Sequence, residues 1–205
     1  MILGITGGSG CGTTTVGLML REKGFCFIDA DAVYHELLEH DESLRIRLTV
    51  RFGHGILSDG KINRRALAAI VFSDEDALAD LNTITHGVIV EEIARRLREL
   101  NGRNAAVEAI ALFESGLAEL CDASVSVLCD REVRIRRITA RDSITEVEAA
   151  SRVDAQKDDS YFIDNSDYIL LNNGTEAELR SALEHLLTAL EGNREDNKQE
   201  ETENV

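Results

Sequence analysis

Five short apolar runs, separated by longer segments of helical pattern, constrain the fold of this chain more than any other feature of its sequence. Continuous apolar strands that alternate with helices are typical of a parallel sheet whose two faces are both covered. A chain of 205 residues can bury such a core without disulfides or a structural metal. The sequence therefore predicts an α/β fold with a five-stranded parallel sheet. The five runs are Ile2–Thr6, Phe25–Ile28, Ala105–Leu112, Val125–Leu128 and Tyr168–Leu171.

Two long strand-free segments interrupt this alternation. The first, from about Val33 to Leu100, contains helix-start signals: Asn63 precedes one apolar segment, and Ser73 lies three residues before Asp76. Its size predicts a helical insert that covers a substrate. The second, from Asp130 to Asp158, is a helical insert rich in arginine.

The end of the chain has two parts. Thr175 and Glu178 form a capping-box pattern, which predicts the start of a last helix there. The apolar face of that helix is predicted to contain Leu179, Leu183, Leu186, Leu187 and Leu190. Beyond this helix the chain is polar and acidic, so we expect residues 193–205 to form a disordered acidic tail.

The charge balance limits the partners of the chain. Lys and Arg number 22 and Asp and Glu number 38, which gives a net charge of −16. This field repels nucleic acids and anionic membranes, so a phosphorylated ligand needs a local binding pocket. No apolar run approaches the roughly 20 residues of a membrane span, and the first residues lack the pattern of a signal peptide. We expect a cytoplasmic protein that is a monomer or weak homo-oligomer and acts on a small molecule, without binding nucleic acid or membrane.

The strongest local motif is the segment Gly7–Thr14, which reads GGSGCGTT and lies between the first predicted strand and the first helix. Glycines there let consecutive backbone N–H groups face one anion, and the helix N-terminus adds partial positive charge. The segment predicts a phosphate-binding loop in which the Thr14 hydroxyl holds the Mg²⁺ position. However, the pattern G-x-x-x-x-G-K-[ST] has a lysine where this chain has Thr13. The alternative is a tight glycine-rich turn without a ligand.

Carboxylates follow or end two of the predicted strands. Asp29 and Asp31 come directly after the second run, and Glu108 lies in the third. Ligands of open parallel sheets bind at the carboxyl ends of the strands, so these groups could provide a general base or a substrate or metal contact. Glu108 could act on Mg²⁺ through water. The alternatives are N-capping of the next helix by the aspartates, and contact of Glu108 with solvent or a neighbouring N–H.

Five arginines lie within eleven residues of the second insert. Because Arg134, Arg137 and Arg141 are spaced by three and four residues, they share one helix face. Guanidinium groups suit phosphate oxygens, which predicts an anion site. The alternative is a solvated face paired with neighbouring carboxylates. Arg152 and Gln156 form a further pair four residues apart.

Taken together, the motifs resemble those of dephospho-coenzyme A kinases. They are ITGGSGCG, IDAD, FG-x-x-IL-x-DG-x-INR-x-x-L, VF-x-D, LFESGL, RI-x-x-RD, R-x-x-x-Q and NNGT, in this order over residues 1 to about 190. The resemblance implies ATP-dependent phosphorylation of the ribose 3′-hydroxyl of dephospho-coenzyme A. It also implies a P-loop NTPase-type three-layer sandwich. Residues 1–32 and 101–192 would form the nucleotide-binding core, residues about 131–160 a helical lid, and residues 33–100 a coenzyme A-binding insert.

The resemblance also implies roles for individual residues. Asp31 corresponds to the base that accepts the ribose hydroxyl proton, and Arg141 is a catalytic lid arginine. The expected nucleotide-binding residues are Gly8, Gly10, Cys11, Gly12, Thr13, Thr14, Thr15, Arg137, Arg152, Asn173 and Gly174. The acceptor is expected to contact Asp31, Arg64, His86, Phe113 and Glu114, and Mg²⁺ is expected to involve Thr14 and Glu108.

Two departures from the family pattern lie at expected site residues, and the first of them bears on the chemistry. Thr13 stands in place of the family lysine, and Glu108 stands where the family usually has aspartate. Thr13 offers one hydrogen bond but no charge, so we expect reduced activity. The alternatives are a weak or inactive P-loop protein that binds nucleotide or coenzyme A, and a kinase for another nucleoside-type acceptor.

Overall fold

The computed structural model describes residues 1–203, with side chains described as far as residue 192. Its five main strands form one sheet in the order β2-β5-β1-β6-β7, and the pairs β2–β5 and β6–β7 are parallel. The strands are β1 (Ile2–Thr6), β2 (Cys26–Asp29), β5 (Ala105–Glu108), β6 (Ala123–Leu128) and β7 (Tyr168–Leu171). The predicted α/β fold with a five-stranded parallel sheet is confirmed.

One strand is shorter than the sequence predicts. We expected a strand over Ala105–Leu112, but β5 ends at Glu108 and the chain then turns. Leu112 is nevertheless fully buried, in a cluster with Val107 and Ile93. The apolar run continues past the strand because these residues fill the core, which a pattern of hydrophobicity cannot distinguish from strand pairing.

The chain folds into two compact units. One contains residues 1–4 and 24–123, and the other contains residues 5–23 and 124–205. This division groups β2 and β5 with the helical segment 33–100, whereas the sequence-based boundaries assign both strands to the nucleotide-binding core. Each unit has a buried apolar cluster of its own.

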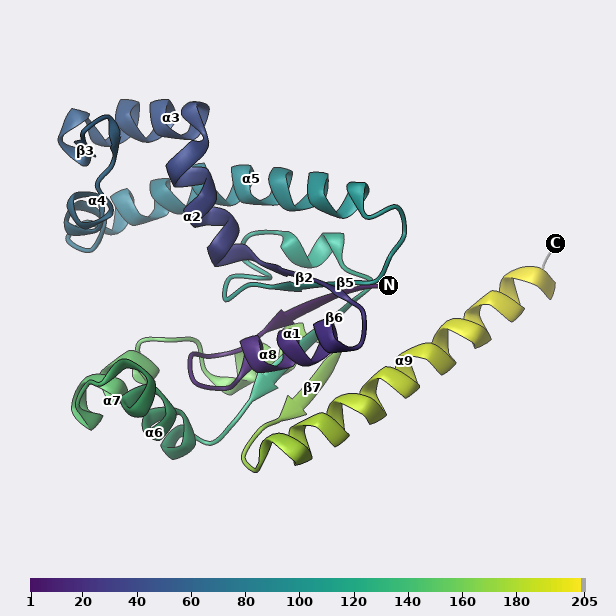
Figure 1. Ribbon diagram of the computed structural model, residues 1–205. Coiled ribbons are helices and arrows are strands. Elements are labelled where there is room, and N and C mark those ends of the chain that lie inside the picture. The colour runs from purple at the N-terminus through teal and green to yellow at the C-terminus, as the bar shows by residue number, and fades with distance from the viewer. Residues whose placement is uncertain (204–205) are drawn as a thin grey trace. The chain divides into compact units, whose positions relative to one another are not determined.

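The first unit contains four α-helices and two short 3-10 helices, His54–Ile56 and Leu117–Leu120. Asn63 caps α4 by accepting hydrogen bonds from the N–H groups of Arg65 and Ala66, as predicted. Helices α2, α3 and α4 all contact α5 (Figure 1). Leu44, Leu48 and five further buried residues form the core of this group. This core holds the insert together. The helices are α2 (Ala30–His40), α3 (Glu42–Phe52), α4 (Arg64–Val71) and α5 (Glu75–Glu99).

The insert also contains a hairpin that we did not predict. Strands β3 (Leu57–Ser58) and β4 (Lys61–Ile62) pair antiparallel, and Asp59 and Gly60 both have positive φ angles in the turn between them. An Asp-Gly pair between apolar residues is the signal for such a turn. The hairpin was missed because strands of two residues are too short for an alternating pattern.

The predicted start of α5 was also wrong by one residue. Asp74, not Ser73, accepts the hydrogen bonds from the N–H groups of Asp76 and Ala77. The Ser73 hydroxyl instead donates back to the carbonyl oxygen of Ile70 at the end of α4. Ser73 therefore bonds to the end of α4, whereas Asp74 caps the start of α5.

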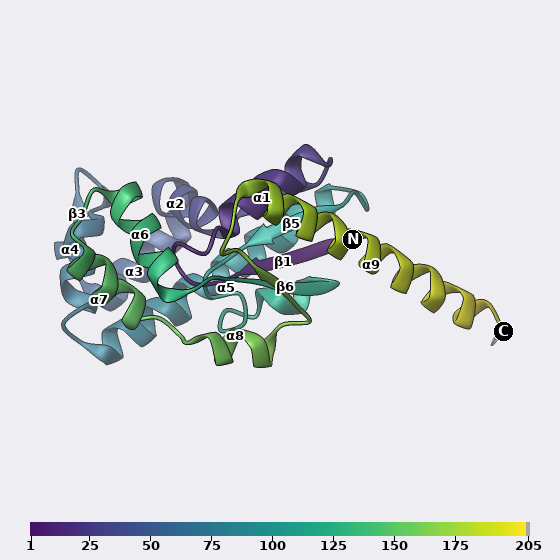
Figure 2. The same ribbon diagram turned by 90° about the horizontal axis from the view of Figure 1, so that it is seen from below.

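The second unit contains the remaining helices. Helices α6 and α7 lie side by side (Figure 2) and share a small core of Ile138, Ala149 and Val153. Helix α9 begins with the predicted capping box of Thr175 and Glu178. The helices are α1 (Thr13–Glu22), α6 (Arg131–Asp142), α7 (Glu146–Asp154), α8 (Asp159–Asn165) and α9 (Glu176–Glu203).

Helix α9 is longer than predicted. We expected a disordered tail over 193–205, but α9 continues to Glu203, and residues 204–205 lie outside the described residues. The segment contains four Glu, which are good helix formers, and no proline. Within the described residues, none of the helices is both long and apolar enough to cross a membrane.

Candidate active site

The glycine-rich loop connects β1 to α1 in the second unit. Gly12 is the N-cap of α1 and adopts a left-handed conformation with φ of 97°. A Cβ atom at this position would lie 2.5 Å from Nδ2 of Asn172, so both the backbone conformation and the space favour glycine. Thr13, Thr14 and Thr15 then form the first turn of α1. The predicted strand, loop and helix N-terminus of a phosphate site are therefore present.

Three arginines of α6 reach the loop from one helix face, as the spacing predicts. The Arg134 guanidinium donates to the carbonyl oxygen of Ser9 at 3.1 Å, and Arg137 donates to that of Gly10 at 3.3 Å. Arg141 donates to the Ser9 hydroxyl at 3.3 Å. The alternative of a solvated face is therefore wrong for Arg134 and Arg137. Arg141, whose side chain is 59% exposed, also pairs with Asp142, as that alternative predicts.

Asn172, which the sequence analysis did not single out, fastens the loop to the end of β7. Its Nδ2 donates to the carbonyl oxygen of Cys11 at 2.7 Å, and its Oδ1 accepts from Arg137 at 3.3 Å. Its backbone N–H donates to the carbonyl oxygen of Leu128, and the residue is only 6% exposed. Asn172 therefore joins three segments that are far apart in sequence.

We expect Asn172→Ala to lower the free energy of unfolding by about 1–3 kcal/mol, because it leaves buried polar groups without partners. Urea denaturation of the variant and the parent measures this loss. The matched control is Asn173→Ala, since Asn173 is exposed and bonds only to Asp130 in the described residues. Equal stability of the two variants would contradict the role of Asn172.

Asn173 and Gly174, two of the expected nucleotide-binding residues, directly follow Asn172. Asn173 exchanges two hydrogen bonds with Asp130, through its Oδ1 and its Nδ2. Gly174 precedes the capping box of α9, and a Cβ atom there would lie 2.9 Å from Cδ of Glu178. Both residues shape the loop after β7.

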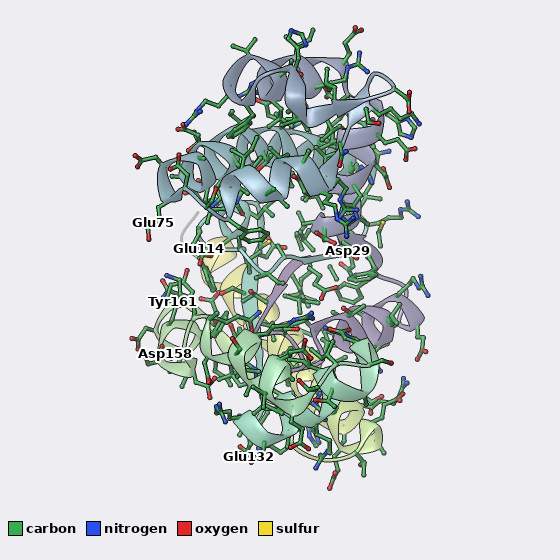
Figure 3. The ribbon with its side chains drawn as sticks, turned by 90° about the vertical axis from the view of Figure 1, so that its left-hand side faces the viewer. Asp29, Glu75, Glu114, Glu132, Asp158 and Tyr161 are labelled. Atoms are coloured by element: carbon green, nitrogen blue, oxygen red, sulfur yellow. The ribbon has the colours of Figure 1, made fainter. Side chains whose placement is uncertain are left out.

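The expected lid arginines Arg141 and Arg152 both bond to Asp142. Arg141 donates through Nε at 2.7 Å and Arg152 through NH1 at 2.8 Å. The Arg141 hydrogen bond lowers the pKa of the Asp142 carboxyl, and Arg152 adds to the effect. Within the described residues, Arg152 bonds to Asp142 rather than to the loop, so in this conformation Asp142 takes the place that an anion could take. In the same unit, Asp158 caps α8 ahead of Tyr161 (Figure 3).

Two buried cysteines also lie at the loop. Cys11 belongs to the loop, and the Cys129 thiol lies 3.7 Å from the carbonyl oxygen of Gly10. A hydrogen bond from Cys129 lowers the pKa of the Cys11 thiol to about 7, against the effect of burial and with help from Arg134. The same hydrogen bond raises the pKa of Cys129.

We expect the Cys11 thiolate to form with a midpoint near pH 7, about two units below the ordinary 9.0 of a cysteine. The sign follows from the hydrogen bond, which favours the deprotonated sulfur. Ultraviolet thiolate absorbance of the parent minus that of Cys11→Ser, followed against pH, measures the midpoint. A midpoint above the ordinary value would contradict this assignment.

In the first unit, Asp29 and Asp31 have different surroundings at the start of α2. Asp29 is the N-cap (Figure 3), and its Oδ1 accepts from the N–H groups of Asp31 and Ala32. Asp31 lies in the first turn with its side chain 79% exposed, 3.8 Å from Nε2 of His35. The capping alternative is thus correct for Asp29, while the carboxylate of Asp31 faces solvent.

Other expected acceptor residues lie in the same unit. Burial raises the pKa of Tyr34, the Arg64 charge opposes this, and the Asp31 charge adds to it. Burial lowers the pKa of His86, and the nearby Glu114 charge opposes that shift. The charges of Asp31 and Arg64 therefore both act on Tyr34, and that of Glu114 acts on His86.

Phe113 contacts the core, whereas Glu108 lies at the end of a strand. Phe113 is half-buried and packs against the cluster that contains Val107, so it is partly a core residue. Glu108 ends β5 in register with Asp29 of β2, which places two carboxylates at the carboxyl ends of adjacent strands. Among the residues with described side chains, no cluster of three or more His, Cys, Asp or Glu could hold a metal by itself.

Comparisons with known proteins show which family the chain resembles. The sequence profile described as dephospho-CoA kinase matches residues 1–178. The dephospho-CoA kinase of Corynebacterium glutamicum is 35% identical over 192 residues, 92% of this chain and 96% of that protein. That of Geobacter sulfurreducens is 35% identical over 189 residues, 90% of this chain and 96% of that protein.

Solved structures share the fold. The dephospho-CoA kinase from Campylobacter jejuni has a TM-score of 0.69 at 26% identity, over 94% of this chain and 98% of that one. Shikimate kinase from Bacteroides thetaiotaomicron shares the fold with a TM-score of 0.54 at 16% identity, over 93% of this chain and 98% of that one. The profile and the curated relatives each cover most of the sequence, and the chain belongs to the dephospho-CoA kinase family.

Proposed function

We propose that the chain transfers the γ-phosphoryl group of ATP to the 3′-hydroxyl of the ribose of dephospho-coenzyme A, giving coenzyme A and ADP. The observation that carries this proposal is the glycine-rich loop between β1 and α1 with the arginines of α6 on it. Family membership supports the acceptor. In this proposal the second unit binds the nucleotide, and the first unit binds the acceptor.

The loop fits a triphosphate by the chemistry of its donors. The N–H of Ser9 and a guanidinium N–H of Arg134 converge on one oxygen, the Oε1 of Gln156. A phosphoryl oxygen accepts the same pair of donors. We therefore assign the triphosphate to residues 8–15, with Arg137 and Asn172 holding the loop in shape, and the adenine to the loop of Asn173 and Gly174.

Mg²⁺ is proposed to bind together with the nucleotide. Since Mg²⁺ is usually held by one or two protein groups and the substrate phosphates, the lack of a protein-only cluster in the described residues fits this expectation. The Thr14 hydroxyl and the Glu108 carboxylate are the groups that we assign to it. When bound, the ion neutralises charge on the phosphoryl oxygens.

Asp31 is proposed as the base. Its exposed carboxylate at the first turn of α2 can accept the proton of the ribose hydroxyl, while Asp29 holds the backbone of that turn. The base needs little tuning, because in a loose transition state the proton leaves late. Arg64 is proposed to bind an anionic part of the acceptor, and His86, Phe113 and Glu114 to line its binding surface.

Arg141 and Arg152 are proposed to exchange Asp142 for phosphoryl oxygens in the reacting complex. Both guanidinium groups would then stabilise charge that develops in the transition state and help to exclude water from the transferred group. Because Asp142 holds both arginines in this structure, the exchange needs only their release from one carboxylate.

A coupled ADP-release assay with dephospho-coenzyme A as acceptor tests the function. Adenosine, AMP and shikimate serve as comparison acceptors, and ATP without acceptor gives the background. We expect release that depends on dephospho-coenzyme A. Release with a comparison acceptor alone would favour another kinase, and ATP binding without release would favour a binding protein.

A further inference from the structure

Arg134 is a buried cation whose hydrogen bonds go to neutral groups. The residue is 5% exposed. Its Nε donates to the carbonyl oxygen of Ser9 at 3.1 Å, and its NH2 donates to Oε1 of Gln156 at 2.5 Å. A buried charge is costly unless an opposite charge compensates it. Among residues 1–192, no ion pair of Arg134 is found.

Other arginines of the same insert differ in this respect. Arg131 pairs with Asp154 at 2.8 Å, and Arg141 and Arg152 both pair with Asp142. The hydrogen bond from Arg131 lowers the pKa of Asp154, and the charge of Arg134 only adds to this effect. Arg134 therefore keeps a positive charge that these carboxylates leave available for another anion.

Gln156 occupies the position where such an anion would bind. Its Oε1 accepts from the backbone N–H of Ser9 at 2.9 Å as well as from Arg134. Two converging donors, one of them charged, form the usual environment of a phosphoryl oxygen. The amide oxygen satisfies both hydrogen bonds but brings no negative charge. It is a neutral substitute for an anion.

The glycine at position 8 leaves space for the Arg134 guanidinium. An ideal Cβ atom at Gly8 would lie 2.6 Å from Cζ of Arg134, so any side chain at position 8 would displace the arginine. The charge also reaches the inside of the loop, because Arg134 contributes to the low pKa of Cys11. The guanidinium therefore lies against the loop backbone itself.

We propose that Arg134 is the phosphate-binding cation of this loop and compensates for the lysine that is absent at position 13, with a phosphoryl oxygen of ATP displacing the Gln156 oxygen. This inference rests on the proposed function. It makes Arg134 a catalytic residue, since its guanidinium would touch the β- or γ-phosphoryl group. It also explains how a loop with Thr13 can serve a kinase.

Calorimetric titration of Arg134→Gln with ATP and with AMP tests the binding step. We expect the affinity for ATP to fall by about 10- to 100-fold, the usual effect of one charged hydrogen bond, while AMP affinity stays unchanged. The matched control is Arg136→Gln, an exposed arginine of the same helix, which should bind both nucleotides as the parent does. Equal losses for ATP and AMP would overturn the proposal in favour of a structural role.

A double-mutant cycle with Thr13→Lys tests the compensation. We expect Arg134→Gln to lower kcat by about 10²–10³-fold in the parent background, and far less in the Thr13→Lys background, where the introduced ammonium group supplies the charge. A purely structural arginine would cause the same loss in both backgrounds, and that result would overturn the proposal.

Further measurements distinguish a variant that does not fold from one that has lost its function. Far-ultraviolet circular dichroism and thermal melting identify a variant that does not fold. In that case Arg134→Lys, which keeps the charge, replaces it and should retain the parent's preference for ATP over AMP; loss of that preference in a folded Arg134→Lys variant would overturn the proposal. A parent that binds ATP but does not phosphorylate dephospho-coenzyme A would contradict the proposed function instead, and the ATP and AMP titrations would still decide the role of Arg134.

Discussion

Replacing Asp31 with Asn is expected to lower kcat for dephospho-coenzyme A by ~10²–10⁴-fold, the usual contribution of a general base. Asn keeps the size of the side chain but cannot accept the hydroxyl proton. The N-terminus of α2 should stay intact, because Asp29 provides its cap through two hydrogen bonds. Initial rates in the ADP-release assay, at saturating ATP and acceptor, measure the loss.

Glu39→Gln is the matched control for this variant. Glu39 is another exposed carboxylate of α2, and it lies near His40 and Lys61 rather than Asp31. Exposed ion pairs contribute little, so the control should keep the parent's rate and stability. If Asp31→Asn were as active as Glu39→Gln, Asp31 would not be the base.

Replacing Thr13 with Lys is expected to raise turnover by about tenfold or more, because one preorganised donor is commonly worth ~10²–10³-fold in rate. Thr13 begins α1 directly after the loop, where an ammonium group could reach the triphosphate. We expect a smaller rise in turnover than a new cation would give in a loop without any charge, because Arg134 already contributes a positive charge. Steady-state kinetics of the variant and the parent give the ratio.

Leu18→Lys controls for the added charge. Leu18 lies on the same helix with 39% of its surface exposed, so a lysine there adds the same charge away from the loop. We expect no gain in turnover from this control. If Thr13→Lys gave the parent's turnover too, the lysine position would not matter in this chain.

Local patterns predicted the first strand, the glycine-rich loop and the helix that follows it. The loop could be recognised because glycine spacing, strand and helix are all local features. The common face of Arg134, Arg137 and Arg141 follows from helical spacing alone. What the spacing could not give is the target of each arginine, since Ser9 and Gly10 lie more than 120 residues away in the chain.

The contacts that the sequence did not predict are long-range or conformational. Asn172 contacts Cys11 across 161 residues, and Gln156 contacts Ser9 across 147. A single sequence shows no sign of such pairs, although the NNGT and R-x-x-x-Q motifs contain both residues. The sequence could not tell which of Asp29 and Asp31 caps α2, because either side chain can act as a cap or as a base. The backbone of the structure decides this, since the N–H groups of Asp31 and Ala32 donate to Asp29.

The central claim is that a phosphate-binding loop without its lysine binds the triphosphate of ATP. Calorimetric titration of the parent with ATP and Mg²⁺ tests it most directly, with AMP as the comparison ligand. We predict saturable binding of one ATP per chain with a Kd below about 1 mM, the usual range for substrates, and weaker binding of AMP. Absence of binding at millimolar ATP, or equal affinity for ATP and AMP, would contradict the claim.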